Sequence, residues 1–110
     1  MEVENSQVPG LDLLWQDERG QILARCSARF NVWDYIENPG EVSRSCCLRF
    51  IDEYGDTTFN QSQISVLIGE LEELFPKSKS EKASQSLQTL IAFARQAEGE
   101  IHTYLTFIGD

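Results

Sequence analysis

Apolar side chains occupy every second position over a stretch that begins at Ile22 and ends at Val32. A period of two kept over this length is typical of a β-strand with one buried face and one solvent-exposed face. The alternating apolar residues are Ile22, Ala24, Cys26, Ala28, Phe30 and Val32. The sequence therefore predicts a long, half-buried strand in an antiparallel sheet.

Two neighbouring segments repeat this alternation. Residues 11–16 are apolar at Leu11, Leu13 and Trp15, and residues 42–50 are apolar at Val42, Cys46, Leu48 and Phe50. The turn-forming sequences 17–20 and 38–40 separate the three segments. Three consecutive antiparallel strands, a meander, are the simplest arrangement.

Two helices are predicted from apolar residues at helical spacing. Asn60 followed by Gln63 resembles a capping box, and Pro76 ends the first helix. Its apolar stripe consists of Ile64, Leu67, Ile68, Leu71, Leu74 and Phe75. A second capping box, Ser78 with Glu81, predicts the start of the next helix, and Gly99 is suited to cap its end.

Short β-prone segments flank the helices, at 57–59 and 101–108. Strands segregated from helices indicate an α+β fold. We expect an antiparallel sheet, a meander plus the C-terminal strand, covered on one face by an antiparallel helical hairpin, in the order β-β-β-(β)-α-α-β. The direction of the last strand relative to its neighbours stays open. One domain is expected over residues 1–110, with a polar arm over 1–10.

The charge limits the partners. The 110 residues include 18 acidic and 9 basic side chains, a net charge of −9, which disfavours non-specific nucleic-acid binding and anionic membranes. No apolar run approaches the roughly 20 residues that span a bilayer, and the acidic start lacks the features of a signal peptide. Three cysteines without a Cys-x-x-Cys pair fit a reducing compartment, so we expect a cytoplasmic protein with Cys26 and Cys46 in its core.

Catalytic and metal signatures are weak. The single histidine, His102, has no nucleophile near it in the sequence, and no glycine elbow or phosphate-binding loop occurs. Asp52, Glu53 and Asp56 are close together, as in a calcium loop, but the further oxygen ligands of such a loop are missing. An enzyme is the minority hypothesis, and no metal or cofactor is expected.

Residues 31–37 are the better functional candidate. Trp33 and Tyr35 alternate with Asp34 and Glu37, and Trp and Tyr are enriched at binding hot spots. Together with Asp52, Glu53 and Asp56 these carboxylates predict an acidic edge that selects a basic protein partner. The structural alternative is that the two aromatic rings fold back and close one end of the molecule.

Three arginines suggest a second kind of site. Arg25, Arg29 and Arg49 fall opposite the apolar positions of the predicted strands, on the open face of the sheet. There they would receive an anionic small molecule or peptide. The same face could instead pair two copies of the chain in a homodimer.

Two segments carry a resemblance to known proteins. Residues 54–60, Tyr-Gly-Asp-Thr-Thr-Phe-Asn, and the ending His102-Thr-Tyr-Leu-Thr-Phe-Ile-Gly-Asp resemble small uncharacterised bacterial proteins of about this length. In size, acidity and α+β build the chain is also similar to immunity proteins, which neutralise a co-encoded toxin. That resemblance implies a protein-interaction module that inhibits a basic toxin or nuclease. The alternatives are a small-molecule or peptide sensor on the open sheet face and a homodimeric domain.

Overall fold

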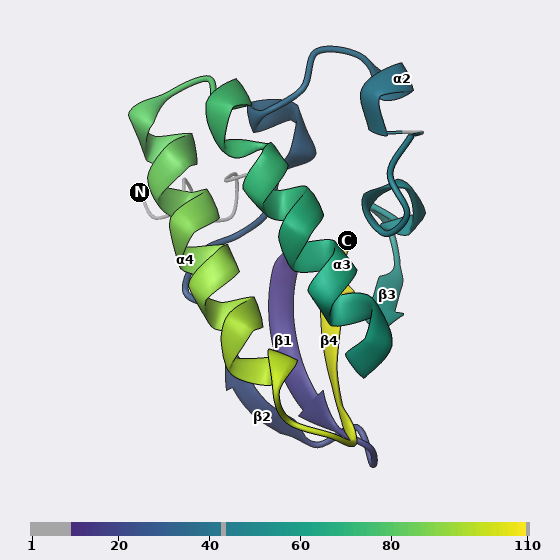
Figure 1. Ribbon diagram of the computed structural model, residues 1–110. Coiled ribbons are helices and arrows are strands. Elements are labelled where there is room, and N and C mark those ends of the chain that lie inside the picture. The colour runs from purple at the N-terminus through teal and green to yellow at the C-terminus, as the bar shows by residue number, and fades with distance from the viewer. Residues whose placement is uncertain (1–9, 43, 110) are drawn as a thin grey trace.

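The computed structural model describes residues 10–42 and 44–109, and its centre is a four-stranded antiparallel sheet (Figure 1). The strands β1 (Asp12–Asp17), β2 (Ile22–Arg25), β3 (Asp56–Phe59) and β4 (Thr103–Ile108) lie in the order β2-β1-β4-β3. The predicted α+β class with an antiparallel sheet is confirmed. The predicted arm lies outside the described residues, except for Gly10.

The strand β4 is central, because it pairs with both β1 and β3, antiparallel to each. This settles the open question about the last strand. The hairpin between β1 and β2 turns where the sequence predicts it. There the Asp17 carboxylate accepts hydrogen bonds from the backbone N–H groups of Arg19 and Gln21, and Gly20 has a φ of +83°.

The helices α3 (Gln61–Glu73) and α4 (Glu81–Glu98) pack side by side against one face of the sheet (Figure 1). The capping box at the start of α3 is confirmed, with Asn60 as N-cap, and Gly99 caps the end of α4. The predicted start at Ser78 is wrong. The N-cap of α4 is Ser80, because the Ser78 N–H closes the preceding 3₁₀ helix η3 (Phe75–Lys77) instead.

The core lies between this helix pair and the sheet. Apolar residues at helical spacing on α3 and α4 meet the inward side chains of β1 and β4, as the apolar stripes predict. Each such side chain contributes about 1.5–3 kcal/mol by leaving water. The fully buried residues of this layer include Leu13, Ile64, Leu67, Leu71, Leu87, Leu90, Leu105 and Phe107.

The long strand predicted over residues 22–32 ends at Arg25. The N–H of Cys26 donates to the Leu13 carbonyl, but the next paired residue is Phe30, which exchanges two hydrogen bonds with Leu11. The four-residue step from Cys26 to Phe30 therefore matches a two-residue step from Leu13 to Leu11, and the residues between Cys26 and Phe30 loop out of the pairing. Cys26 and Phe30 both still pack against the core, as the alternation predicts, whereas Ile22 at the start of the stretch is exposed.

The strand predicted over residues 42–50 is wrong. The chain forms the short helix α2 (Pro39–Val42) and then a 3₁₀ helix, η2 (Leu48–Phe50). As a result Cys47 is buried and Cys46 exposed, the reverse of the prediction. No described helix is both long enough and apolar enough to span a membrane.

Candidate functional site

The connection from β2 to β3, residues 26–55, is the least regular part of the molecule. Within its described residues the only helices are η1 (Val32–Asp34), α2 and η2, each of three or four residues. Connections of this length without longer elements are uncommon and are often functional. Figure 1 shows this segment running from β2 past the ends of α3 and α4 to α2, and then back beside α3 to β3.

Tyr35 fastens the first half of the connection to the helix pair. Its hydroxyl donates to the Ala83 carbonyl at 2.9 Å, and its ring stacks on that of Phe30 with centroids 6.0 Å apart. Burial, reinforced by the neighbouring Asp34 carboxylate, raises the pKa of Tyr35 to about 12. Tyr35 is therefore a packing residue, and its expected role as an exposed binding residue is wrong because only 2% of its surface is accessible.

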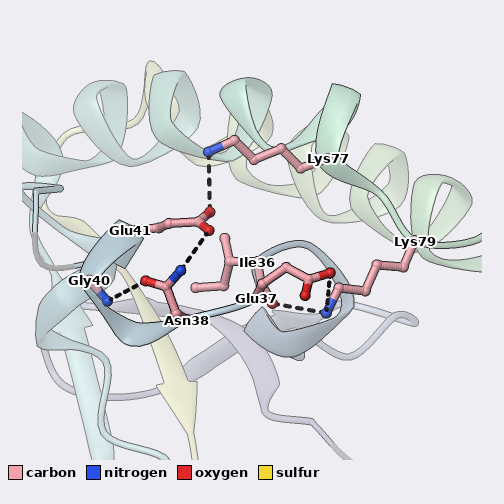
Figure 2. A network of polar contacts seen from close by, with 7 residues as sticks. All are labelled: Ile36, Glu37, Asn38, Gly40, Glu41, Lys77 and Lys79. Atoms are coloured by element: carbon pink, nitrogen blue, oxygen red, sulfur yellow. Dashed lines mark hydrogen bonds and ion pairs between the residues drawn. The ribbon is translucent and has the colours of Figure 1, made fainter.

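Two lysines just beyond the end of α3 hold the next part of the connection (Figure 2). Lys79 Nζ donates to the Ile36 carbonyl at 2.9 Å and lies 3.9 Å from the Glu37 carboxylate. Lys77 Nζ lies 3.5 Å from the Glu41 carboxylate, to which Asn38 also donates. Glu37 therefore already has a basic partner within the chain, which weakens its assignment to the partner-binding edge.

Glu70 of α3 holds the second half of the connection. Its carboxylate accepts hydrogen bonds from three consecutive backbone N–H groups, those of Cys46 at 2.6 Å, Cys47 at 3.1 Å and Leu48 at 3.0 Å. Successive N–H groups of a strand point in opposite directions, so this convergence is incompatible with the predicted strand. Burial, with the Glu70 carboxylate as second cause and Cys46 as third, raises the pKa of the Cys47 thiol.

A cavity of about 340 Å³ lies between these fastened segments. Its apolar lining residues are Leu11, Phe30, Val32, Val42, Leu48 and Ile51, and its remaining lining residues are Trp33, Arg49 and Glu53. The indole Nε1–H of Trp33 donates to the Glu53 carboxylate at 3.1 Å. This bond joins two residues that the sequence assigns to the same binding edge although they are 20 positions apart.

Trp33 is exposed, and so are two further aromatic side chains, Phe50 and Tyr54, which lie on either side of Glu53 in the sequence. Trp33 is 42% exposed, Phe50 60% and Tyr54 80%. Trp and Tyr are enriched at binding hot spots, and carboxylates lie close to these side chains in the sequence. We call the following set the aromatic–acidic surface: Trp33, Asp34, Phe50, Asp52, Glu53, Tyr54 and Asp56.

The carboxylates of this surface differ from those shown in Figure 2. Asp34, Asp52, Glu53 and Asp56 form no ion pair with any residue that the structure describes. Asp52 shapes the turn before β3, since its carboxylate accepts from the Tyr54 N–H at 2.9 Å. Their charges are therefore not neutralised by ion pairs within the described part of the chain.

The three arginines of the alternative site do not share one sheet face. Arg25 lies on β2, whereas Arg49 lies on η2 and lines the cavity. Arg29 donates to the Gly10 carbonyl at 2.7 Å and lies 3.3 Å from the Asp12 carboxylate. The expected face is wrong because the strands that would have carried Arg29 and Arg49 are not formed.

The remaining chemical candidates are dispersed. His102 is exposed, with Nδ1 3.6 Å from the Glu18 carboxylate, and Cys47 Sγ contacts the Gln63 carbonyl. Within residues 10–42 and 44–109, no three His, Cys, Asp or Glu side chains converge as metal ligands would.

Sequence reasoning missed two residues of this site, Phe50 and Glu70. Phe50 was predicted on a strand that does not exist, and Glu70 was not singled out. Arg49 was singled out as an anion-binding residue, but on a sheet face that is not formed. The available signal for Glu70 was its spacing from the apolar stripe, since it lies three residues after Leu67 and four residues before Leu74.

Comparisons with known proteins give no match: no family model, curated protein or solved structure is similar to this chain. The likeness to immunity proteins therefore stays a hypothesis.

Proposed function

We propose that this protein is a small protein-interaction module that binds a basic partner through the aromatic–acidic surface. The observation that carries the proposal is the Trp33–Glu53 contact. It holds a 42% exposed indole beside the carboxylate of Glu53, and Phe50 and Tyr54, close to Glu53 in the sequence, are exposed as well. A rigid aromatic side chain with a fixed polar neighbour is a typical hot-spot residue.

Charge supports a basic partner. Residues 31–60 contain six acids and two bases, and the two acids of that stretch that pair within the chain, Glu37 and Glu41, lie outside the aromatic–acidic surface. Unpaired carboxylates steer a positively charged protein and raise its association rate. The mechanism is occlusion: Trp33 fills a pocket on the partner while the carboxylates pair with its basic groups. In the specific form suggested by the resemblance, the chain is an immunity-type inhibitor that covers the active site of a toxin or nuclease in the cytoplasm.

The test uses a charge-neutral surface and a matched control. The variant Asp52→Asn/Glu53→Gln/Asp56→Asn keeps the hydrogen-bond acceptors and removes three charges. The control removes three charges elsewhere, at exposed residues without an ion pair in the described chain: Glu73→Gln, Glu81→Gln and Glu100→Gln.

Immobilised wild type should capture a basic protein from cells of the source organism, and purified partner should then bind with measurable rates. We expect the surface variant to lower the association rate about tenfold and the control to leave it within about twofold. Trp33→Ala should raise the dissociation rate about 30-fold, as expected for a residue worth about 2 kcal/mol. Inhibition of the partner's enzymatic activity at a 1:1 ratio would support the immunity-type form.

Two results would contradict the proposal. One is a partner that is acidic, or that binds the surface variant and the control equally fast. The other is self-association: a dimer in sedimentation velocity that Trp33→Ala dissociates would assign the surface to a second copy of the chain.

A further inference from the structure

The cavity beneath Trp33 has the size and lining of a small-molecule site. Its volume of about 340 Å³ lies at the lower end of the roughly 300–1,000 Å³ usual for ligand pockets. At about 30 Å³ for each water-sized group it has room for about ten non-hydrogen atoms. Six of the nine lining residues that the structure describes are aliphatic or phenyl side chains, so most of the occupant must be apolar.

The two charged lining residues are not equivalent. The Glu53 carboxylate already accepts the Trp33 indole N–H at 3.1 Å. The Arg49 guanidinium lies over the Phe50 ring, 4.8 Å from its centroid, and forms no hydrogen bond or ion pair with a described residue. A guanidinium has five N–H donors in a planar arrangement that matches a carboxylate. The open polar position of the cavity therefore suits an anion.

The backbone of Arg49 is held in place before any ligand arrives. Its backbone N–H donates to Ser45 Oγ at 2.9 Å, and Glu70 fixes the three residues that precede it. The Phe50 ring limits the orientations of the guanidinium plane. A ligand then loses less binding energy to ordering the protein.

We propose that this cavity binds a small free carboxylic acid that has about ten non-hydrogen atoms in all and an aromatic or branched apolar body. The carboxylate pairs with Arg49, and the body lies against the aliphatic walls and the Trp33 indole. This site shares Trp33 and Glu53 with the aromatic–acidic surface. The two functions are told apart by their measurements, which are ligand binding by the cavity and protein binding by the surface.

Phenylacetate is the probe, with phenylacetamide and phenethylamine as neutral and cationic analogues of similar size. The full chain is titrated and its backbone and indole N–H groups are followed by NMR. We expect a dissociation constant for phenylacetate on the order of 0.1–1 mM, and binding of both analogues at least about tenfold weaker. The Trp33 indole resonance should shift, while that of Trp15, on β1 and outside the cavity lining, should not.

Two variants separate the charge from the cavity. Arg49→Gln should weaken phenylacetate binding about 10- to 100-fold, and Arg25→Gln, which changes an exposed arginine of β2, should leave it unchanged. Val42→Phe, which fills part of the cavity, should abolish binding. If the larger phenylalanine side chain impairs folding, the comparison of Arg49→Gln with wild type still tests the proposal.

The proposal is overturned if phenethylamine binds as tightly as phenylacetate, if Arg49→Gln binds like wild type, or if 10 mM phenylacetate leaves the Trp33 resonance in place. A peptide's C-terminal residue offers the same chemistry. Much tighter binding of acetyl-glycyl-phenylalanine than of phenylacetate would assign the cavity to the C-terminus of a peptide. It would overturn the proposal that the ligand is a small free acid.

Discussion

Glu70 is the residue whose replacement tests most directly how the connection is held. Its carboxylate, on α3, accepts three backbone N–H groups at the start of η2. We predict that Glu70→Gln loosens residues 46–48 because the amide retains one acceptor oxygen and turns an N–H₂ donor toward backbone donors. Glu73→Gln is the matched control, since Glu73 is exposed on the same helix and forms no ion pair with a described residue.

The size of the effect follows from the kind of bond that is lost. A hydrogen bond to a charged group contributes about 1.5–3 kcal/mol, and a carboxylate at a helical N-terminus adds a few tenths. Glu70 is partly accessible to water and one acceptor survives in the amide, so we expect a loss of about 1.5–2.5 kcal/mol. The control should stay within about 0.5 kcal/mol.

Native-state amide hydrogen exchange measures this loss where it occurs. The exchange of the Cys46, Cys47 and Leu48 amides should accelerate about 10- to 70-fold in Glu70→Gln, while the amides of β4 change far less if the connection opens on its own. Equal exchange rates of the residue 46–48 amides in Glu70→Gln and in Glu73→Gln would show that the Glu70 carboxylate does not stabilise this segment.

Three further predictions concern single groups. The pKa of Tyr35, about 12 in the folded state against about 10 unfolded, means that its contribution to stability is complete below pH 10 and is lost as the pH rises toward 12. Tyr35→Phe should remove that decline in urea unfolding and cost about 1 kcal/mol at pH 7 through the lost hydrogen bond. At pH 8, iodoacetamide should modify exposed Cys46 at least about tenfold faster than Cys47, whose thiol pKa is raised by burial, and equal rates in mass spectrometry would contradict this. Gly109→Ala should destabilise by about 1–3 kcal/mol in urea unfolding because its Cβ would overlap the backbone of the turn before β3, whereas Gly69→Ala, which has open space, should stabilise by about 0.5–1 kcal/mol.

The helices and most of the sheet were predictable because their signals are local. The capping box at Asn60 and the apolar stripe that follows it lie within one element, and each is satisfied there. The direction of β4 was not predictable, since it depends on which strands lie on either side of it. That choice is made by packing across the whole sheet.

The two wrong strands show where alternation misleads. Cys26 and Phe30 do face the core, but the pattern reports the side on which a residue lies and not whether a partner strand is present. Around Cys46 and Cys47 a carboxylate 22 or more residues away takes three N–H groups that a strand would have used. Nothing in the sequence of residues 42–50 indicates that the Glu70 carboxylate accepts these N–H groups.

The candidate site was predicted in part for a similar reason. Trp33, Asp52, Glu53 and Asp56 were singled out from residue type, and the structure brings Trp33 and Glu53 together. Residue type alone could not predict that Trp33 is exposed and Tyr35 is buried. The Trp33 indole donates to Glu53 at the surface, whereas Tyr35 donates to the Ala83 carbonyl and stacks on the Phe30 ring in the core.

The cavity and the Glu70 contact share Leu48, which leads to a last prediction that rests on the proposed carboxylate site. Leu48 and Arg49 line the cavity, and they lie at or directly after the N–H groups that Glu70 holds. A ligand that binds only the closed connection must stabilise it by mass action, so phenylacetate at ten times its dissociation constant should slow the exchange of the residue 46–48 amides about tenfold. By the reciprocity of linkage, Glu70→Gln should weaken phenylacetate binding to the extent that it opens the connection appreciably. Unchanged exchange at saturating ligand would mean that the cavity and the Glu70 contact are independent, and that the connection does not act as one unit.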